Sequence, residues 1–532
     1  MTNKNQNRRD FIKTGAAGLA TITLLGNSKV DAMFIDGDPF PELVEVTIPQ
    51  LQANMKAGQL TSRRLTEMYL ERIKQIDSRT RSVLETNPDA LAIADQMDKE
   101  RKRGKVRSML HGIPILIKDN IDTADKMQTT AGSLALVDAP TPKNDAFVVQ
   151  QLRKAGAVII GKTNLSEWAN FRGQRSISGW SGRGGQTNNP YFLDQNPCGS
   201  SSGSGVSVSA NLVAASVGTE TNGSIICPAL TNGVVGIKPT LGLVSRTGII
   251  PIAHTQDTAG PMARTVTDAT ILLGAMVGPD KEDPITIDAK KGAKDYKKFL
   301  DADGLKGARL GLVLQFLPRQ NTEQVKAYYQ PFIDALRAAG ATLVDVTFIP
   351  DYGQIGNDRT NVLQYEFKTD LNKYLAGRGA KYKTLEDLIK FNEENKEREL
   401  PKFGQELFIE SQKKGDLTDK AYLDALSKIK KATREDGIDA VLAKDKLDGL
   451  VGPTSGAIWS IAAVAGYPFI TVPLGLREST NAQGAPNIAA TGMAFFGRPF
   501  SEPQLITYAY AFEQKTKGRV TPQFLPTFPK KA

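Results

Sequence analysis

The chain repeats one short unit, an amphipathic helix that ends at a glycine and leads directly into an apolar strand. The two copies occupy residues 146–160 and 322–348, with Gly156 and Gly340 at the turns. A glycine ends a helix readily at this point because it tolerates the left-handed backbone conformation. Helices that alternate with short apolar strands predict an α/β fold, with a sheet covered on both faces by helices.

Length and composition predict a globular protein. With 532 residues, of which 40% are hydrophobic and 23% charged, the chain can bury one large core or two to three ordinary ones. Its net charge of +10 is spread along the chain, and the densest basic cluster, Lys99 to Arg107, includes Glu100 and no aromatic residue. We interpret this cluster as solvated surface and expect no nucleic-acid partner.

The chain holds two cysteines, Cys198 and Cys227, and two histidines, His111 and His254. This count excludes a disulfide-rich scaffold, leaves few ligands for zinc and weakens any mechanism that needs a histidine base. The two cysteines either form a disulfide or remain buried thiols, and both alternatives stay open. Neither histidine has an obvious partner in the sequence, so we interpret both as structural.

The N-terminus has the pattern of an export signal. An arginine pair, Arg8 and Arg9, is followed by a mildly apolar stretch over residues 14–25. Paired arginines with weak hydrophobicity favour a twin-arginine-type signal peptide over residues 1–32. The alternative, an uncleaved membrane anchor, is disfavoured because a span needs about 20 apolar residues. We expect a periplasmic mature protein, residues 33–532, without stable membrane association.

A short apolar run, Ile113 to Ile117, ends in a lysine, Lys118. This pattern predicts a buried strand with the amine at its C-terminal end. Burial disfavours the charged form and lowers a lysine pKa from its usual ~10.4, so Lys118 is a candidate general base. A surface lysine that follows a strand is the alternative, and it is the more common one for such a segment taken alone.

Residues 198–240 are rich in Gly, Ser, Ala, Thr and Asn. A Gly/Ser tract is often a linker, but this one runs into valines and leucines from Val206 to Val217, which favours packed core around a site. Its loop from Gly199 to Gly205 concentrates hydroxyl groups. A phosphate-binding loop is disfavoured because no Lys-Ser/Thr pair follows the glycines and no GxGxxG register fits.

Residues 218–224 form a glycine-containing approach to a serine, Ser224. Attack on a carbonyl needs a backbone that stays close to the substrate and aims N–H groups at the developing oxyanion. Gly223 and Asn222 are residue types that tolerate the positive φ angles of such a turn. Ser224 is therefore a candidate nucleophile, whereas a Gly-Ser pair considered alone is more often an ordinary turn.

Together these segments resemble the amidase signature family, most strongly over residues 100–275. The resemblance rests on several motifs, namely Gly112 to Ile115, Lys118-Asp119, Asn196 to Gly203, Gly218 to Pro228, Gly233 to Thr240, Asp257 to Pro261 and Gly466 to Pro473. The family's fold implies a single large mixed, twisted β-sheet sandwiched by helices. We interpret residues 280–445, which are richer in charge, as a largely helical region beside or over this core.

The family's mechanism, carried onto the matching positions, implies Lys118 as base, Ser200 as relay and Ser224 as the nucleophile that forms an acyl-enzyme. It also implies a cis peptide bond in the Gly199–Ser200 region and a supporting hydrogen bond from Ser201. The implied oxyanion hole consists of four backbone N–H groups, those of Thr221, Asn222, Gly223 and Ser224. Attack expels ammonia or an amine and water then releases the acid. The resemblance implies no metal and no organic cofactor.

Two departures from the family pattern bear on the substrate. Many relatives have glycine where this chain has Asn222, and many have arginine two residues after the nucleophile, where this chain has Ile226. The missing cation weakens the case for small substrates with a free carboxylate. The variants from Cys198 to Gly205 and from Glu220 to Pro228 are most similar to the peptide amidase branch. This similarity implies hydrolysis of C-terminal carboxamides of peptides.

Other functions are open to a chain with these motifs. Within the family they are a general amidase for small aliphatic or aryl amides, a fatty-amide hydrolase, and an amidotransferase subunit that releases ammonia from glutamine. The amidotransferase subunit is cytosolic and needs a partner, whereas the predicted signal favours export and no obligatory protein partner. A non-catalytic amide-binding protein is disfavoured because Lys118, Ser200 and Ser224 are all present.

Overall fold

The computed structural model describes residues 38–532, except 294, 318–321, 348–354, 481–485 and 528–532. The predicted signal peptide, residues 1–32, lies outside the described residues. Within the described part of the chain, no helix has both the length and the apolar character needed to cross a membrane.

Among the described residues, eleven strands form one mixed sheet in the order β1-β3-β2-β6-β8-β7-β12-β13-β11-β9-β10, and β4 and β5 form a separate pair. The strands have these bounds: β1 Val83–Thr86, β2 Pro114–Lys118, β3 Val158–Thr163, β4 Trp180–Ser181, β5 Gly185–Gln186, β6 Ala215–Glu220, β7 Val235–Lys238, β8 Thr258–Ala263, β9 Arg309–Val313, β10 Thr342–Val346, β11 Gly449–Pro453, β12 Phe469–Thr480 and β13 Pro486–Phe496. Strand β2 runs parallel to β3 and β6, whereas β6 pairs antiparallel with β8. The predicted α/β fold with one large mixed sheet is confirmed.

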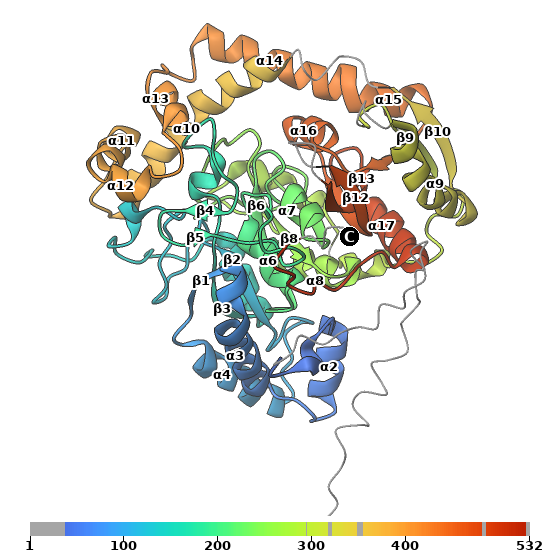
Figure 1. The fold of residues 1–532 in the computed structure, drawn as a ribbon, viewed down its shortest axis with the longest axis horizontal. Coiled ribbons are helices and arrows are strands. Elements are labelled where there is room, and N and C mark those ends of the chain that lie inside the picture. The colour runs from blue at the N-terminus through green and yellow to red at the C-terminus, as the bar shows by residue number, and fades with distance from the viewer. Residues whose placement is uncertain (1–37, 294, 318–321, 348–354, 481–485, 528–532) are drawn as a thin grey trace, which may run out of the picture.

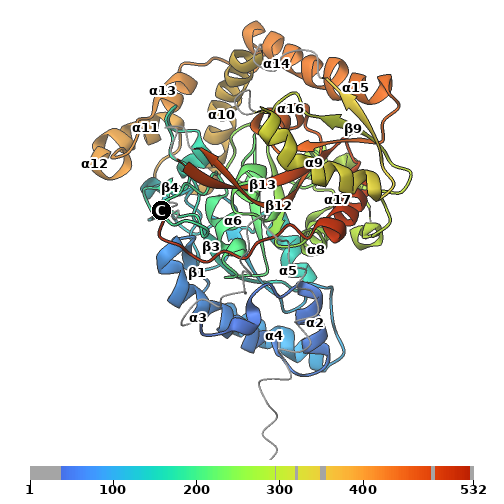
Figure 2. The same cartoon turned by 45° about the vertical axis from the view of Figure 1, so that its right-hand side comes forward.

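Helices cover both faces of this sheet. They have these bounds: α2 Ile48–Lys56, α3 Ser62–Thr80, α4 Ala90–Lys102, α5 Phe147–Ala155, α6 Ser202–Ser209, α7 Ile226–Thr231, α8 Val266–Met276, α9 Thr322–Ala338, α10 Gly356–Arg378, α11 Leu385–Glu394, α12 Lys396–Glu399, α13 Glu406–Gln412, α14 Lys420–Thr433, α15 Asp439–Lys444, α16 Gly456–Ala465 and α17 Glu502–Thr516. One group of contacting helices includes α6 and α7, and another includes α5, α8 and α17. In Figure 2, α9 and α17 lie side by side, and they are in contact.

The repeated helix–glycine–strand unit folds as the sequence predicts. Helix α5 ends at Gly156, whose φ is 89°, and strand β3 follows. Helix α9 is followed by Gly340, whose φ is 94°, and then by strand β10. Both glycines adopt the left-handed conformation that other residues reach only at a cost.

The central strands are buried over their full length because helices cover the sheet on both sides. Every residue of β2, β3 and β6 is buried. Continuous apolar runs of this kind are typical of parallel strands in a covered sheet. Ile117 of β2 pairs with Val217 of β6, so Lys118 at the end of β2 lies beside the end of β6.

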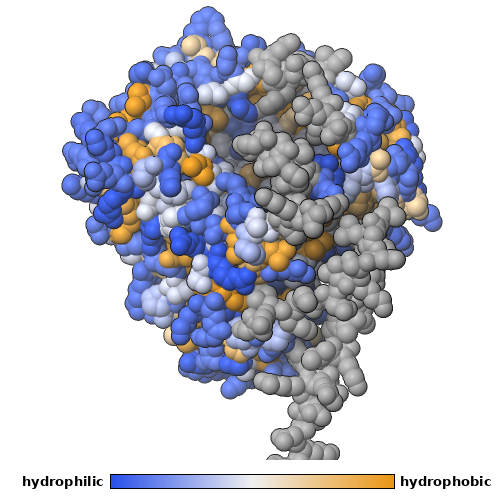
Figure 3. Space-filling view, viewed as in Figure 1, coloured by the Kyte–Doolittle hydropathy of each residue, from blue (hydrophilic) through white to orange (hydrophobic). Residues whose placement is uncertain are grey.

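Residues 280–445 contain helices α9 to α15 and also extend the sheet. Strand β9 pairs parallel with both β10 and β11 and so adds two strands at one edge. Helices α10 to α15 form an arc across the top of the molecule in Figure 1. The face drawn in Figure 3 is mostly hydrophilic, with hydrophobic residues in small groups.

Helix α10 docks on the core through one apolar stripe. Its buried residues at four-residue spacing are Leu363, Phe367, Leu371 and Leu375. Four-residue spacing places side chains on one face of a helix. The stripe packs in a second hydrophobic cluster, separate from the main core, together with Trp168, Phe171, Ile250 and Ile252. The docking brings α10 against the loop that precedes β8.

Candidate active site

Lys118 is fully buried at the end of strand β2. Its Nζ donates to Thr219 Oγ1 at 2.9 Å and to the Thr219 carbonyl at 3.3 Å, and it lies 2.8 Å from Ser200 Oγ. Burial lowers the pKa of Lys118 to about 7, and the carboxylates of Asp257 and Glu220 oppose this shift only in part. Near neutral pH a substantial fraction of the amine is therefore uncharged and has a lone pair that can accept a proton.

Ser200 lies in the loop before α6, and the Gly199–Ser200 peptide bond is cis, as the resemblance implies. Ser201 contacts Thr219 rather than Lys118. Its Oγ donates to the Thr219 carbonyl at 3.0 Å and accepts from the Thr219 N–H at 3.1 Å. Thr219 therefore joins Ser201 to the lysine. Sequence reasoning missed Thr219, although a hydroxyl near the end of a small-residue strand was a signal that could have found it.

Ser224 lies between the end of β6 and the start of α7. Its carbonyl accepts from the Ser201 N–H at 3.1 Å, so the two serine-bearing segments lie side by side. Its side chain is buried, since the residue is 8% exposed. Within the described residues, no hydrogen bond joins Ser224 Oγ to Ser200 Oγ. The structure thus brings Lys118 and Ser200 into direct contact and places Ser224 next to them through the backbone.

The segment before Ser224 turns at Gly223, whose φ is 84°. A Cβ at this position would lie 2.4 Å from the indole nitrogen of Trp459, so only glycine fits. The expectation of a positive φ at Asn222 is wrong, because Asn222 is not among the positive-φ residues. Its Oδ1 instead accepts from Ser460 Oγ at 2.6 Å, and this bond to α16 orients the side chain.

The backbone N–H groups of this turn are not used inside the described part of the protein. Among the described residues, none accepts a hydrogen bond from the N–H groups of residues 221–224. Immediately after them, Glu220 Oε2 accepts from the N–H groups of Ile225 at 2.8 Å and Ile226 at 3.0 Å. The buried Glu220 carboxylate therefore anchors the start of α7 and leaves the preceding four donors free.

Cys198 and Cys227 form a disulfide, which the sequence left open. The bond joins the residue two positions before Ser200 to the residue three positions after Ser224. The N-terminal side of the serine loop is thereby linked covalently to helix α7. This link limits how far the two serine-bearing segments can separate.

A cavity of about 480 Å³ lies beside Ser200. Thr219, Glu220 and Thr221 form one part of its wall, and His254 and Asp257 form another. Helix α10 completes the wall with five residues, which are Asp370, Lys373, Tyr374, Gly377 and Arg378. The sequence did not single out these α10 residues, because nothing in their spacing shows that the helix docks over the site.

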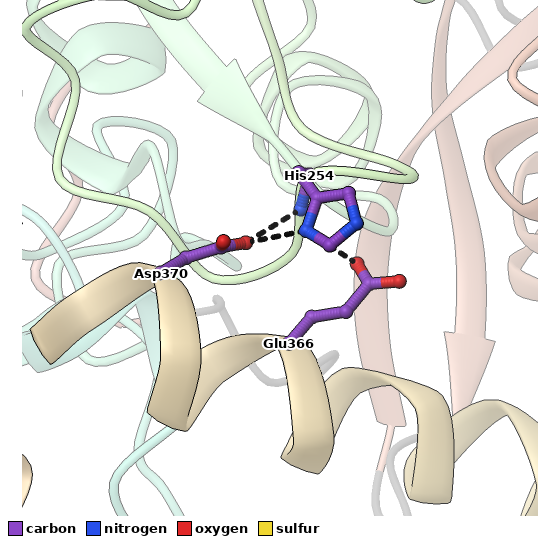
Figure 4. A group of neighbouring side chains, drawn as sticks. All are labelled: His254, Glu366 and Asp370. Carbon is purple, nitrogen blue, oxygen red and sulfur yellow. Dashed lines mark hydrogen bonds and ion pairs between the residues drawn. The ribbon is translucent and has the colours of Figure 1, made fainter. Parts of the chain in front are cut away.

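The structure gives both histidines partners that the sequence did not reveal. His111 is buried, and its Nε2 lies 3.0 Å from the Met97 carbonyl. His254 lies in the cavity wall with its Nδ1 2.8 Å from Asp370 Oδ2 and 3.6 Å from Glu366 Oε2 (Figure 4). The interpretation of His254 as structural therefore leaves out its place in the cavity wall.

His254, Glu366 and Asp370 are the candidate metal ligands of the described residues, since their ligand atoms all lie within 4.8 Å of one another. Both carboxylates, however, already accept backbone hydrogen bonds through the converging oxygens. Asp370 Oδ2 accepts from His254 N–H at 3.1 Å, and Glu366 Oε2 accepts from Thr255 N–H at 3.0 Å. We therefore interpret the group as a hydrogen-bonded cluster rather than a metal site.

Comparisons with known proteins agree with this geometry. The family model described as Amidase matches residues 64–460. A probable amidase of Arabidopsis thaliana is 44% identical over 90% of this chain and 92% of its own length. A glutamyl-tRNA(Gln) amidotransferase component from Thermoanaerobacter pseudethanolicus is 32% identical over 91% of this chain and 99% of its own length.

The similarity extends to solved structures. The native peptide amidase of Stenotrophomonas maltophilia has a TM-score of 0.84 and 48% identity, and the match covers 91% of this chain and 99% of that one. The family match over residues 64–460 spans the buried lysine and both serine loops, and the two relatives and the solved structure each cover about nine tenths of the chain. The protein therefore belongs to the amidase signature family and is an amide-hydrolysing enzyme.

Proposed function

We propose that this enzyme hydrolyses C-terminal carboxamides of peptides and releases ammonia, with Ser224 as nucleophile, Ser200 as relay and Lys118 as base. The observation that supports this proposal most is the 2.8 Å contact between Lys118 Nζ and Ser200 Oγ in a fully buried setting. A buried amine with a pKa of about 7 can exchange a proton with a hydroxyl near neutral pH.

The surroundings of Lys118 favour this role through the direction of its lone pair. A neutral amine has two N–H donors and one lone pair, and Thr219 offers two acceptors, its Oγ1 and its carbonyl. With both N–H groups donated to Thr219, the lone pair faces Ser200 Oγ. Ser200 can then donate its proton to the amine and accept one from Ser224.

The proposed reaction has two stages. Ser224 Oγ attacks the amide carbonyl while its proton passes to Ser200 and the Ser200 proton passes to Lys118. Collapse of the tetrahedral intermediate breaks the C–N bond, and the proton returns along the same path to the leaving ammonia. Water then attacks the acyl-enzyme with the same proton path, which releases the acid and restores the Ser224 hydroxyl.

The oxyanion of this intermediate needs donors that are already in place. The four N–H groups of residues 221–224 have no acceptor among the described residues, and the Gly223 turn brings them close together. Preorganised donors of this kind stabilise the transition state, and removal of one such donor from an oxyanion hole costs about 2.7–4 kcal/mol. This segment, Thr221, Asn222, Gly223 and Ser224, is our proposed oxyanion hole.

The cavity supports a peptide amide as substrate. Its volume of about 480 Å³ lies within the usual range for sites that hold small organic ligands. Its wall carries charges of both signs, with Asp122 and Asp370 on one hand and Arg246 and Lys373 on the other. These charged groups can bind the polar backbone of a peptide, and apolar residues of the same wall, such as Ile250 and Ile252, can contact its side chains. The 48% identity to a peptide amidase supports the same substrate class.

A general amidase for small aliphatic or aryl amides is the second candidate. It is supported by the 44% identity to a protein described only as a probable amidase. The 32% identity to a glutamyl-tRNA(Gln) amidotransferase component makes glutamine the third compound to compare. These candidates differ in the acyl group of the amide that they hydrolyse. The rates of ammonia release from the corresponding amides therefore distinguish them.

The decisive experiment offers the purified mature protein, residues 33–532, four substrates: a peptide carboxamide, a small aryl amide, a fatty amide and glutamine. We expect ammonia release from the peptide carboxamide without any partner protein, together with a mass increment on a peptide that contains Ser224. Turnover of another compound without turnover of the peptide carboxamide would overturn the substrate assignment.

Ser224→Ala is the matched control for the mechanism. It removes the attacking oxygen and is expected to abolish turnover and the mass increment, with an unchanged circular dichroism spectrum. Full activity in this variant would remove Ser224 from the proposed role.

We also propose that residues 1–32 direct export of the protein by the twin-arginine route and that residues 33–532 form the mature enzyme. The supporting observation is the pair Arg8-Arg9 before a weakly apolar stretch. Replacement of both arginines by lysine should leave the protein in the cytoplasm in a cell fractionation assay. Unchanged export of that variant would contradict the assignment.

A further inference from the structure

Two carboxylates on helix α10 hold one loop of the cavity wall. Glu366 and Asp370 are four residues apart and therefore point from the same face of the helix (Figure 4). Glu366 Oε2 accepts from both the N–H and the Oγ1 of Thr255 at 3.0 Å. Asp370 Oδ2 accepts from the His254 N–H at 3.1 Å and lies 2.8 Å from His254 Nδ1. The backbone at residues 254–255 is thus fixed to α10.

The same loop contacts the segment that leads to Ser224. Asp257 Oδ2 accepts from the N–H groups of Ile252 at 2.8 Å and Ala253 at 2.9 Å, which closes the loop on itself. Its other oxygen, Oδ1, accepts from Thr221 Oγ1 at 2.5 Å. The loop backbone joins these two sets of hydrogen bonds, so α10 is connected through residues 252–257 to Thr221, the first residue of the proposed oxyanion hole.

Charged groups surround this loop on several sides. Arg246 donates through Nη1 to the His254 carbonyl and pairs with Asp283. Burial alone would lower the pKa of His254, but the hydrogen bond with Asp370 and the charge of Glu366 outweigh it and raise that pKa. This shift favours the protonated imidazole, which binds a carboxylate more strongly than the neutral ring does.

Glu366 differs from Asp370 in its access to the cavity, and this difference allows a test of positioning without substrate contact. Glu366 is fully buried and is not part of the cavity wall, whereas Asp370 and His254 line the cavity. A substrate in the cavity can touch the latter two but has no access to Glu366. On the side away from the loop, Glu366 Oε1 accepts from Tyr422 OH at 2.9 Å. Any effect of Glu366 on the reaction must pass through other residues.

We propose that Glu366 and Asp370 are positioning residues that act through the loop of residues 252–257 to hold Thr221, and with it the proposed oxyanion segment, in its reactive place. This proposal rests on the proposed function of Ser224. It makes the rate of the chemical step depend on the docking of α10, a helix outside the part of the chain that carries Lys118, Ser200 and Ser224.

The test compares Glu366→Gln with Tyr422→Phe in the full mature chain, with a peptide carboxamide as substrate. Glu366→Gln keeps the shape but removes the charge that holds Thr255, and we expect kcat to fall at least about tenfold with KM changed less than about threefold. Tyr422→Phe removes the bond on the opposite side of Glu366 and should leave kcat within about twofold of the wild type. Thermal unfolding of both variants separates loss of fold from loss of positioning.

A double-mutant cycle tests the route through Thr221. Thr221→Val removes the hydroxyl that binds Asp257 and should lower kcat by itself. If Glu366 acts through Thr221, the double variant should be no more than about threefold slower than the slower single variant. Losses in kcat that multiply in the double variant would show independent action and would overturn the proposal.

If Glu366→Gln does not fold, Asp370→Asn and Thr255→Val provide the same test through kcat. Both residues are only partly buried, so these variants are expected to fold. Wild-type kcat in folded Glu366→Gln, or in both of these variants, would overturn the proposal. Ser224→Ala separates the two levels of inference. An active Ser224→Ala variant would contradict the proposed function. An inactive Ser224→Ala variant together with a fully active Glu366→Gln variant would contradict only the positioning role of Glu366.

Discussion

In the proposed mechanism the base is a single buried amine, that of Lys118. Its charge is disfavoured by complete burial, and the neighbouring acceptors on Thr219 bind the amine without a carboxylate in direct contact. A lysine that remains charged at neutral pH would be unable to accept a proton from Ser200. The environment of the side chain, more than its identity, therefore decides whether it can act as a base.

The first prediction concerns pH. Because the pKa of Lys118 is lowered to about 7, the neutral base is lost as the pH falls through that value. We expect kcat/KM for a peptide carboxamide to fall about tenfold per pH unit on the acid side. The measurement is a pH–rate profile between about pH 5 and 9. A flat profile down to the acid end would exclude Lys118 as the base.

A second prediction identifies the charge that opposes this shift. After burial, which lowers the Lys118 pKa, the largest influence is the Asp257 carboxylate, which raises it. Asp257→Asn should therefore move the acid limb of the profile to lower pH. Asp122→Asn is the matched control, since Asp122 also lines the cavity but is not among the charges that act on Lys118. An acid limb at the same pH in the wild type and in Asp257→Asn would contradict the assigned influence of Asp257 on the Lys118 pKa.

At the scale of elements, two short segments must meet at the end of strand β2. The loop before α6 carries Ser200, and the turn before α7 carries Ser224. Two contacts hold them together, the Ser201 N–H to Ser224 carbonyl bond and the Cys198–Cys227 disulfide, while the Glu220 carboxylate accepts from the start of α7 and closes the second segment on itself. Helices as short as α7 gain most of their order from such tertiary ties.

The third prediction tests the covalent tie. The disulfide spans 29 residues of sequence, so its removal should lower the free energy of unfolding by roughly 3–4 kcal/mol. The double variant Cys198→Ser/Cys227→Ser, compared with the wild type by urea denaturation, measures this loss. Wild-type protein treated with a reductant should show a similar loss. Equal urea midpoints for the oxidised wild type and the double variant would show that the disulfide adds nothing to stability.

At the scale of the whole molecule, buried carboxylates link the layers around the sheet. Asp268 of helix α8 is fully buried, and its Oδ1 accepts from the N–H of Ile48, the first residue of α2. Its Oδ2 has no partner in the described part of the chain. Burial raises the pKa of Asp268 to about 7, and the Arg264 charge counters this only in part. The folded state is therefore more stable with the Asp268 carboxyl group protonated than with it ionised.

This gives a fourth prediction, for stability against pH. A carboxyl whose folded pKa is raised from 3.8 to about 7 stabilises the fold fully below the lower value and loses that contribution as the pH rises through the higher one. Asp268→Asn does not titrate, so the variant should lose less stability than the wild type between about pH 4 and 8. The measurement is the thermal unfolding midpoint across this range. Parallel curves would contradict the raised pKa.

Much of the fold and part of the site could be predicted from the chain alone. Apolar runs that end in a charge, such as the one before Lys118, identify buried strands because both faces of a covered sheet must be apolar. Glycines such as Gly156 and Gly223 mark turns because their backbone reaches conformations that other residues avoid. Such signals depend only on residues that are close together in the sequence. They can therefore be recognised without knowledge of the tertiary structure.

Other features were decided only by the tertiary structure, because they depend on which distant segments meet. Thr219 becomes the partner of Lys118 through the pairing of β2 with β6. The Asn222 side chain is held by Ser460, which lies 238 residues further along the chain, and its backbone has no positive φ. Glu366 and Asp370 reach the loop at residues 254–255 only because an apolar stripe docks α10 over it. Local chemistry could name the lysine and the serines, whereas packing between remote elements set their neighbours, the charge of the amine and the walls of the cavity.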